Sequence, residues 1–304
     1  MSTNFAAPLS VVTGATSGVG MPLAIGLARA GRPLLLGVRD PGRGERAAAA
    51  VRAAVPGARV DHAPLDLASL ASVRAFAAGL AGADIGLLVL NAGAMTTSRQ
   101  ETQDGFELMM GTNALAHAAL AGLLLERLAR TPGARIVVQS SEVHRHGRVD
   151  LDDLQAVRRF RPLAAYNASK LALHVLGVEL DRSSGIRTVV AQPGWVNSGL
   201  GRDVTASGNP AQRLVMAVGN RLIGQTPEEG ARAALLAALD PDVPGAATGR
   251  YVTPGGLVRL RGAPRVADAD PNVLDRVLGE CLRRRAEDLT GVALTAPQAV
   301  PGRA

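Results

Sequence analysis

Short apolar runs alternate along the chain with longer segments that have helical spacing. Apolar runs stand at residues 9–12, 33–38, 85–90 and 135–139, and stretches such as 23–30 separate them. A continuous apolar run is typical of a parallel strand that helices cover on both faces. The alternation continues to about Ala191. It predicts an α/β domain built on a doubly wound parallel sheet.

The pattern changes after the last regular run. We expect an irregular segment at about 194–226, then a helix that Thr226 caps, with Pro227 in its first turn. Residues 249–252 are expected to form the last strand, and 271–289 a helical tail within a C-terminal segment of about 270–304. The segment from Thr290 onward is expected to be disordered at its end. No Pro/Gly/Ser-rich linker or internal repeat divides the chain, so residues 1–304 are expected to form a single domain.

A glycine-rich turn follows the first predicted strand and opens the first predicted helix. Glycine permits positive φ and close approach of the backbone to a phosphate, and a helix N-terminus offers free N–H donors to negative charge. Strand, glycine turn and helix in this order predict a dinucleotide site of the Rossmann type. Its candidate residues are Gly14, Thr16, Ser17, Gly18, Val19 and Gly20.

Two further predicted strands end in polar sequences. The run at 85–90 ends in Asn91, Ala92 and Gly93, and the run at 135–139 ends in Ser140 and Ser141. Ligands of doubly wound sheets bind at the carboxyl ends of the strands. We therefore expect these residues and the glycine turn to lie at one rim of the sheet.

Lys170 is the only lysine of the chain, and it stands four residues after Tyr166. Positions four apart lie on one face of a helix, so both side chains can point into the same cleft. A nearby cation favours the phenolate and would lower the pKa of the tyrosine. An exposed helical pair without function is the alternative for an isolated Tyr-x-x-x-Lys, and the other motifs weigh against it.

Together these motifs give the chain a specific resemblance. Thr-Gly-x-x-x-Gly-x-Gly, Asn-Ala-Gly, a serine at a strand end and Tyr-x-x-x-Lys, in this order, resemble the short-chain dehydrogenase/reductase family of the type called classical. The sequences at 36–40, 140–144 and 286–292 are similar to its retinol-dehydrogenase-like and WW-domain-oxidoreductase-like branch. The resemblance spans about residues 8 to 292.

The resemblance implies roles for individual residues. Tyr166 would exchange a proton with the substrate oxygen, and Lys170 would lower the pKa of Tyr166 and hold the nicotinamide ribose. Ser141, rather than Ser140, would bind the substrate oxygen. Asn113 would organise a water relay, and a satisfied amide inside a helix is its alternative. The loop that meets the nicotinamide would comprise Pro193, Gly194, Val196 and Ser198, and the segment at about 194–226 would cover the substrate.

Cofactor choice depends on the end of the second predicted strand. An acidic residue there would bind the ribose of NAD, but the family's acidic position holds Val38 and the next residue is Arg39. A guanidinium suits a 2′-phosphate, so the sequence predicts NADP(H), with Arg43 as a helper. Asp40 leaves NAD(H) as the less favoured cofactor. Asp66 and Leu67 resemble the family's adenine-contacting pair, and Asp66 could also cap the next helix.

Composition limits the other function classes. The net charge is +7, but the arginines are scattered and aromatic residues are 2% of the chain, so nucleic acid is not an expected partner. The single cysteine, Cys281, cannot form an intrachain disulfide, which favours a cytoplasmic protein. The apolar stretch at 114–125 is too short to span a membrane. His144 and His146 could contact substrate, but no third ligand suggests a metal. Alanine- and arginine-rich usage suggests a bacterial source.

The sequence therefore predicts an NADP(H)-dependent oxidoreductase for a carbonyl or alcohol substrate, expected to be lipophilic. Carbon–carbon double-bond reduction or epimerisation on the same scaffold is an alternative, and a non-catalytic NADPH-binding partner protein is another. Helices beginning near Thr102 and Tyr166 match those that pair between subunits in the family, so a homodimer or homotetramer is expected.

Overall fold

One eight-stranded sheet organises the protein. The computed structural model describes residues 7–197, 224–256 and 258–295. The strand order is β3-β2-β1-β4-β5-β6-β7-β8, and β7 and β8 pair antiparallel while the other neighbours pair parallel. The strands are β1 (Leu9–Thr13), β2 (Leu34–Val38), β3 (Val60–Pro64), β4 (Ile85–Leu90), β5 (Arg135–Gln139), β6 (Arg187–Ala191), β7 (Arg250–Pro254) and β8 (Pro264–Asp268). The Rossmann-type doubly wound sheet is thereby confirmed.

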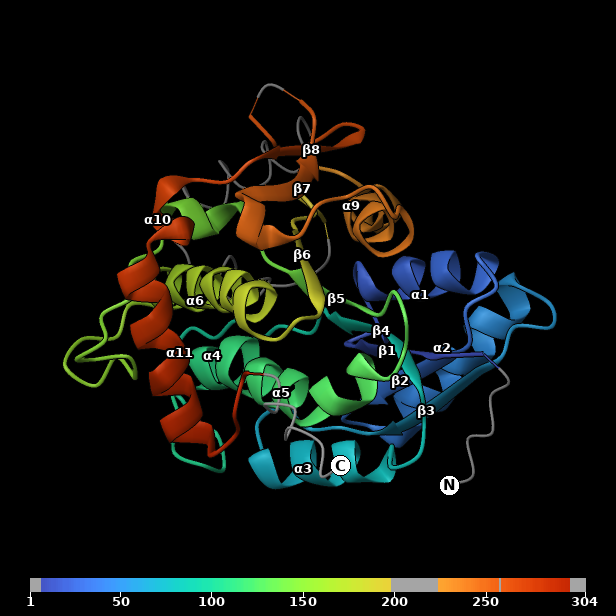
Figure 1. The fold of residues 1–304 in the computed structure, drawn as a ribbon, viewed down its shortest axis with the longest axis horizontal. Helices are drawn as coiled ribbons and strands as arrows, with labels where there is room; N and C mark the ends of the chain where they lie inside the picture. The colour runs from blue at the N-terminus through green and yellow to red at the C-terminus, as the bar shows by residue number, and fades with distance from the viewer. Residues whose placement is uncertain (1–6, 198–223, 257, 296–304) are drawn as a thin grey trace, which may run out of the picture.

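Helices cover both faces of the sheet (Figure 1). One layer comprises α1 (Gly20–Arg29), α2 (Pro41–Ala54) and α9 (Pro227–Leu239). The other layer comprises α3 (Leu70–Gly79), α4 (Leu108–Met110), the π-helical turn η1 (Gly111–Leu115), α5 (Ala116–Ala129), α6 (Pro162–Ser183) and α11 (Arg276–Thr290). Shorter elements are the 3-10 turns η2 (Glu142–His146) and η3 (Ala246–Thr248), and α10 (Pro271–Leu274).

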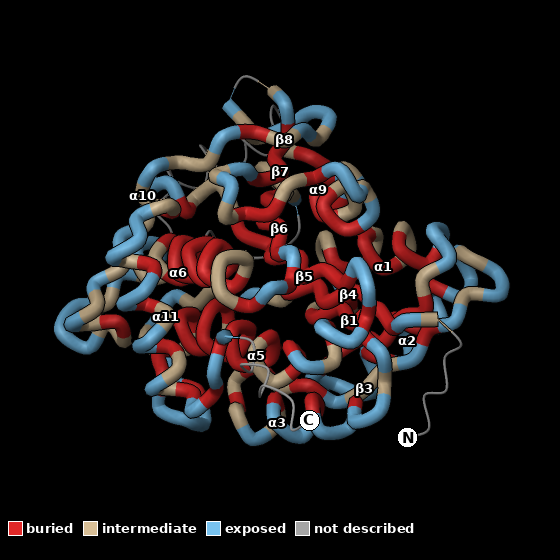
Figure 2. Tube along the Cα trace, in the orientation of Figure 1, coloured by how far each residue is buried: buried red, intermediate tan, exposed pale blue. Residues whose placement is uncertain are grey.

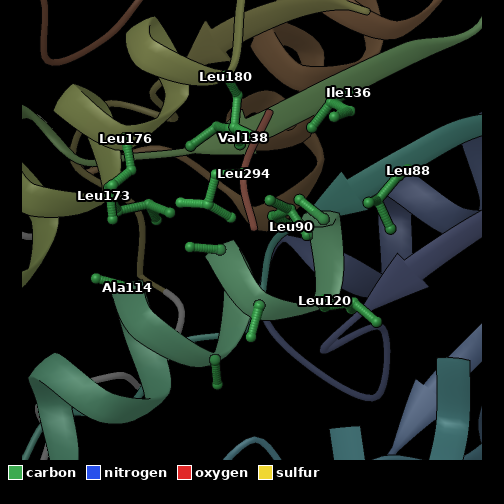
Figure 3. Close-up of a cluster of buried hydrophobic side chains, with 14 of the residues drawn as sticks. Leu88, Leu90, Ala114, Leu120, Ile136, Val138, Leu173, Leu176, Leu180 and Leu294 are labelled. Carbon is green, nitrogen blue, oxygen red and sulfur yellow. The ribbon is translucent and has the colours of Figure 1, made fainter. Parts of the chain in front are cut away.

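The central strands are buried on both faces because their side chains alternate between the two layers (Figure 2). Leu88 and Leu90 of β4 belong to the core beneath α5 and α6, whereas Val89 belongs to the core beneath α1 and α9. Figure 3 shows Leu88 and Leu90 with Leu120 of α5 and Leu176 of α6 in the first of these cores. This packing explains the unbroken apolar runs in the sequence.

The C-terminal part differs from the expectation in two ways. β8 follows β7, so residues 249–252 do not hold the last strand. β8 has the sequence Pro-Arg-Val-Ala-Asp, lies at the sheet edge and lacks an apolar run. The helical tail is divided at Asp275, whose carboxylate accepts from the amides of Val277 and Leu278 and so starts α11. After Thr290 the structure describes residues 291–295, and Leu294 is buried in the core (Figure 3), while the end of the segment lies outside the described residues.

One helix is long and apolar enough to span a membrane by length and composition. It runs from Leu108 to Ala129, longer than the apolar stretch that the sequence suggested, and 78% of its most apolar window is buried inside the protein. This burial, between β4 and α6, makes it a core helix of the second layer.

α11 packs along the outer side of α5 and α6 (Figure 1). Gly122 of α5 leaves room for this segment, since a Cβ there would lie 2.4 Å from the carbonyl oxygen of Ala293. The helices expected to pair between subunits begin at Leu108 and Pro162, and α11 already covers part of them. The homo-oligomer stays a prediction and would have to use a surface that α11 leaves open.

Candidate active site

Ser141 and Tyr166 meet where β5 ends. Tyr166 lies in the second turn of α6 and is buried, and its hydroxyl shares a hydrogen bond with the Ser141 side chain. The Ser140 hydroxyl instead donates to the carbonyl of Lys170 at 3.1 Å. The two serines thus point in different directions, as alternation at a strand end requires. Ser141 is the one placed to share a substrate oxygen with Tyr166.

Lys170 follows one turn later on α6 and is also buried, 4% exposed. Its ammonium donates to the carbonyl of Gln139, the last residue of β5, at 3.1 Å. A Cβ at Gly93 would lie 3.5 Å from Nζ, so the end of the Asn91-Ala92-Gly93 sequence lies over the ammonium. Burial lowers the pKa of Lys170 to about 8, because the charged form loses hydration.

Burial has the opposite effect on the tyrosine. It raises the pKa of Tyr166 to about 12, and the bond with Ser141 offsets only part of this rise. The sequence led us to expect that Lys170 would lower this pKa, and that expectation is wrong for the structure as it stands. The reason is that desolvation dominates, while the ammonium donates to the Gln139 carbonyl.

Asn113 lies in η1, where the helix widens by one residue. Its side-chain oxygen accepts from the amide of Ala94 at 2.7 Å, and its Nδ2 donates to the Ala94 carbonyl and to the Ser169 hydroxyl, both at 3.0 Å. The side chain is therefore a satisfied amide, which was the alternative to the relay role. It also fixes the chain after Gly93 to the helix that carries Tyr166 and Lys170.

The glycine turn lies against the end of β4. Gly14 has φ of 69° and Gly18 of 54°, both in the left-handed region that favours glycine. A Cβ at Gly20 would lie 2.2 Å from the Gly14 carbonyl oxygen, so only glycine fits there. Asn91 donates through Nδ2 to the carbonyls of Thr13 and Gly14 at 2.9 and 3.2 Å.

The start of α1 suits an anionic group. The N-cap of α1 is Val19, whose apolar side chain cannot accept a hydrogen bond, and the first turn of the helix holds no acidic residue. The exposed Ser17 and the half-buried Thr16 stand beside it. The Gly20 amide already donates to the Ser17 carbonyl at 3.2 Å and Pro22 has no N–H, so the Met21 amide and the positive end of the helix dipole are what favour a phosphate at this position.

The end of β2 presents Arg39 rather than an acid. Val38 is buried, whereas Arg39 is exposed and makes no hydrogen bond or ion pair with any described residue. The Asp40 carboxylate accepts from the Arg43 amide at 2.9 Å and caps α2, and this bond lowers the pKa of Asp40. Asp40 is thus committed to the helix, while the Arg39 guanidinium is available to a phosphate.

Two other predicted groups of cofactor residues have mixed outcomes. Asp66 does not cap α3, since Ser69 does; the Asp66 carboxylate accepts from the Ala68 amide at 3.0 Å in a local turn, and Leu67 is buried. Ser69 is the N-cap of α3 because its short side chain accepts a hydrogen bond from the Ser72 amide. Both Asp66 and Leu67 follow β3 at the same rim as the other strand ends.

The loop after β6 is held by buried glutamines. The Gly194 amide donates to Gln192 Oε1 at 2.7 Å, and Gln225 Nε2 donates to the Pro193 carbonyl at 2.7 Å. Val196 forms a parallel bridge with Gln225. Ser198 lies outside the described residues, as does most of the predicted covering segment.

The two histidines near the rim are not equivalent. His144 is fully buried, its Nδ1 donates to the Ser141 carbonyl at 2.7 Å, and its Nε2 lies 3.5 Å from the Asp270 carboxylate. It cannot contact substrate directly, whereas His146 is exposed. Within the described ranges no group of His, Cys, Asp and Glu could hold a metal.

Sequence reasoning missed Thr13 and His117 as site residues. Thr13 Oγ1 lies 3.0 Å from His117 Nε2 and accepts from the amides of Asn91 and Ala92. The available signal was His117 itself, a polar residue that interrupts an apolar helical stretch four positions after Asn113.

Comparisons with known proteins agree with this geometry. The family model for short chain dehydrogenases matches residues 9–208. Polyprenol dehydrogenase from Mus musculus is 38% identical over 90% of this chain and 83% of its own length. Retinol dehydrogenase 13 from Homo sapiens is 34% identical over 86% of this chain and 80% of its own length.

Solved structures give the same result. A protein of unassigned function from Mycobacterium paratuberculosis superposes with a TM-score of 0.76 at 35% identity, covering 95% of this chain and 96% of its own. A short-chain dehydrogenase from Sphingobium yanoikuyae in complex with NADPH has a TM-score of 0.58 at 26% identity, covering 76% and 84%. A doubly wound sheet with these strand ends defines a dinucleotide-binding oxidoreductase. The chain belongs to the short-chain dehydrogenase/reductase family, in its retinol-dehydrogenase-like branch.

The buried ammonium predicts a pH-dependent stability. Below pH 8 both folded and unfolded Lys170 carry the proton, so the folded state bears the full cost of burying a charge. Between pH 8 and about 10.5 the unfolded state holds more protons, so stability rises with pH. Lys170→Met should therefore be more stable than wild type near pH 7, by on the order of 3 kcal/mol before the lost Gln139 bond is subtracted, and this advantage should shrink toward pH 10.5.

Urea unfolding of both proteins between pH 7 and 10 measures this difference. Arg159→Met, at an exposed position, controls for the added methionine and should show no such pH dependence. A difference between Lys170→Met and wild type that stays constant across this range would contradict a depressed lysine pKa.

Proposed function

We propose that this protein is an NADP(H)-dependent oxidoreductase that interconverts a lipophilic alcohol and its carbonyl compound. The observation that carries the proposal is the buried Tyr166 hydroxyl bonded to Ser141, one helical turn from Lys170, at the rim where the glycine turn also lies. A non-catalytic nucleotide-binding protein would not need a buried phenol and ammonium side by side.

Ser141 and Tyr166 would together bind and protonate the substrate oxygen. The Ser141 and Tyr166 hydroxyls can both donate to one substrate oxygen, which fixes its position and stabilises the charge that develops on it. Because the pKa of Tyr166 is about 12, the phenol holds its proton at neutral pH and is ready to give it to the alkoxide oxygen. This protonation state supports carbonyl reduction as the direction for which the resting site is prepared.

NADPH, when bound at the rim, supplies the hydride. The residues present fit such a cofactor: the uncapped start of α1 for the pyrophosphate, the free Arg39 guanidinium for the 2′-phosphate, and Lys170 beneath Gly93 for the ribose hydroxyls. The NADPH complex of a similar dehydrogenase supports this choice over NAD(H).

The substrate class rests on the relatives. Their names include polyprenol and retinol, both long apolar alcohols, and we extend this class to the present chain. Carbon–carbon double-bond reduction remains the second candidate because the same scaffold supports many chemistries. A cytoplasmic location and a homo-oligomer are also proposals, the first from the single cysteine.

The chemical role of Tyr166 can be tested directly. Tyr166→Phe removes the proton donor and leaves the cofactor contacts, so turnover should fall by at least ~10²-fold while NADPH affinity stays near wild type. NADPH oxidation over a panel of apolar aldehydes and ketones, with matched unsaturated compounds, measures turnover and separates the two reactions. Near wild-type turnover in Tyr166→Phe would assign the acid/base work to another group.

Cofactor preference tests Arg39. Arg39→Ala should weaken NADPH binding by about 10- to 100-fold, the value of a hydrogen bond to a charged group, and leave NADH binding nearly unchanged. Dissociation constants for both cofactors give the comparison. Arg46→Ala, at an exposed position on α2, the helix that follows Arg39, is the matched control. Equal losses for NADPH and NADH would show that Arg39 does not contact the 2′-phosphate.

A further inference from the structure

His117 is a buried titratable group that the proposed chemistry does not use. It opens α5, is 0% exposed, and makes contacts with two parts of the site. Its Nδ1 lies 3.0 Å from the carbonyl oxygen of Asn113, and its Nε2 lies 3.0 Å from the Thr13 hydroxyl. One imidazole ring therefore joins the end of β1 to the turn that carries Asn113.

These contacts determine which ring nitrogen carries the proton. A carbonyl oxygen only accepts, so Nδ1 must donate to Asn113. Burial, together with a smaller effect of the Lys170 charge, lowers the pKa of His117 to about 4, so the ring is neutral at physiological pH. A neutral ring with hydrogen on Nδ1 has only a lone pair at Nε2. The Thr13 hydroxyl must then donate to His117.

Because Thr13 donates its hydrogen to His117, both lone pairs of the hydroxyl oxygen can accept hydrogen bonds from other groups. The Thr13 oxygen accepts from the Asn91 amide at 2.9 Å and from the Ala92 amide at 3.0 Å. With one donated and two accepted bonds, the capacity of the hydroxyl is filled. If Nε2 carried a proton, Thr13 would have to accept from it and lose one of the two amides, and its own hydrogen would have to go to the Val89 carbonyl at the longer 3.4 Å.

The amides held in this way belong to the strand end that lies over the active site. Gly93 follows Ala92 directly and lies against Lys170, and Ala94 is bound by the Asn113 side chain. Within the described part of the chain, His117 faces one charged group, Lys170 of α6. Its hydrogen-bond partners, the Thr13 hydroxyl at the end of β1 and the Asn113 carbonyl in η1, are neutral. A change at His117 therefore reaches the glycine turn, the strand end and Asn113 together.

We propose that His117 is a positioning residue whose neutral, Nδ1-protonated ring orients the Thr13 hydroxyl as a donor, and thereby holds the Asn91-Ala92-Gly93 backbone in place for cofactor binding. It acts through Thr13 and touches neither substrate nor cofactor. The cofactor part of this inference rests on the proposed function, because NADPH is the probe of binding.

The protonation state is tested first, and independently of any cofactor. Nitrogen-15 NMR of the histidine side chains in the full-length protein, with His117→Gln to assign the signal, should show hydrogen on Nδ1 and none on Nε2, and no titration between pH 8 and 5.5. Thr13→Val should shift the Nε2 resonance, because it removes the donor. A His117 ring that carries hydrogen on Nε2, or that titrates near the usual pH of about 6.5, overturns the proposal.

A double-mutant cycle tests the route of the effect. His117→Leu and Thr13→Val should each weaken NADPH binding about tenfold, the value of one lost net hydrogen bond. Thr13→Val also removes the acceptor of the Asn91 and Ala92 amides, but because His117 acts through Thr13, the double variant should lose no more than Thr13→Val alone. A loss of about a hundredfold would mean independent effects on stability or packing, and no loss in either single variant would also contradict the proposal.

Conservative and distant variants complete the design. Thr13→Ser restores the hydroxyl and should recover most of the affinity lost in Thr13→Val, and His117→Gln keeps an acceptor and should lie closer to wild type than His117→Leu. Thr188→Val removes another buried hydroxyl, which bonds the Ile186 carbonyl at 3.2 Å at the start of β6, and should leave NADPH binding unchanged. If wild type does not bind NADPH, the proposed function fails while the NMR result on His117 still stands.

Discussion

The site depends on the burial of one ammonium group. Lys170 is the only lysine in the chain and is almost completely removed from solvent, with the Gln139 carbonyl as its hydrogen-bond acceptor. Burying a charge costs free energy unless nearby groups compensate, so the surroundings of Lys170 must be held in place. The end of β5, the Gly93 backbone and the turn η1 all meet at this position, which explains why so many polar backbone groups converge there.

The rim of the sheet is held together by side chains that bond to backbone. Asn91 and Thr13 connect the ends of β1 and β4, Asn113 connects Ala94 to α6 through Ser169, and His117 joins the two sets. Buried polar networks of this kind fix one arrangement because each unsatisfied member would be costly. Rigid positioning of the strand ends is what a cofactor and a proton donor need in order to meet at one substrate atom.

The sequence was sufficient where chemistry and periodicity coincide. Apolar runs located the central strands, and the family resemblance paired Tyr166 with Ser141 at the end of β5. It was insufficient where packing decides. The order of Leu294 depends on contacts with helices that are more than a hundred residues away, and β8 carries no apolar run because it lies at the edge. The pKa of Tyr166 also depends on burial, which spacing along a helix does not reveal.

The most direct test of this account is the replacement Lys170→Arg, with rate measured against pH at saturating NADPH. Arginine keeps the positive charge but is wider and planar, and it cannot lose its proton as the buried lysine can. The account predicts that turnover falls by about tenfold or more, equivalent to ~1.4 kcal/mol in the barrier, and that the pH profile changes shape. Superimposable rates and profiles for the two proteins would show that any cation serves at this position, and would contradict the central role given to the buried lysine.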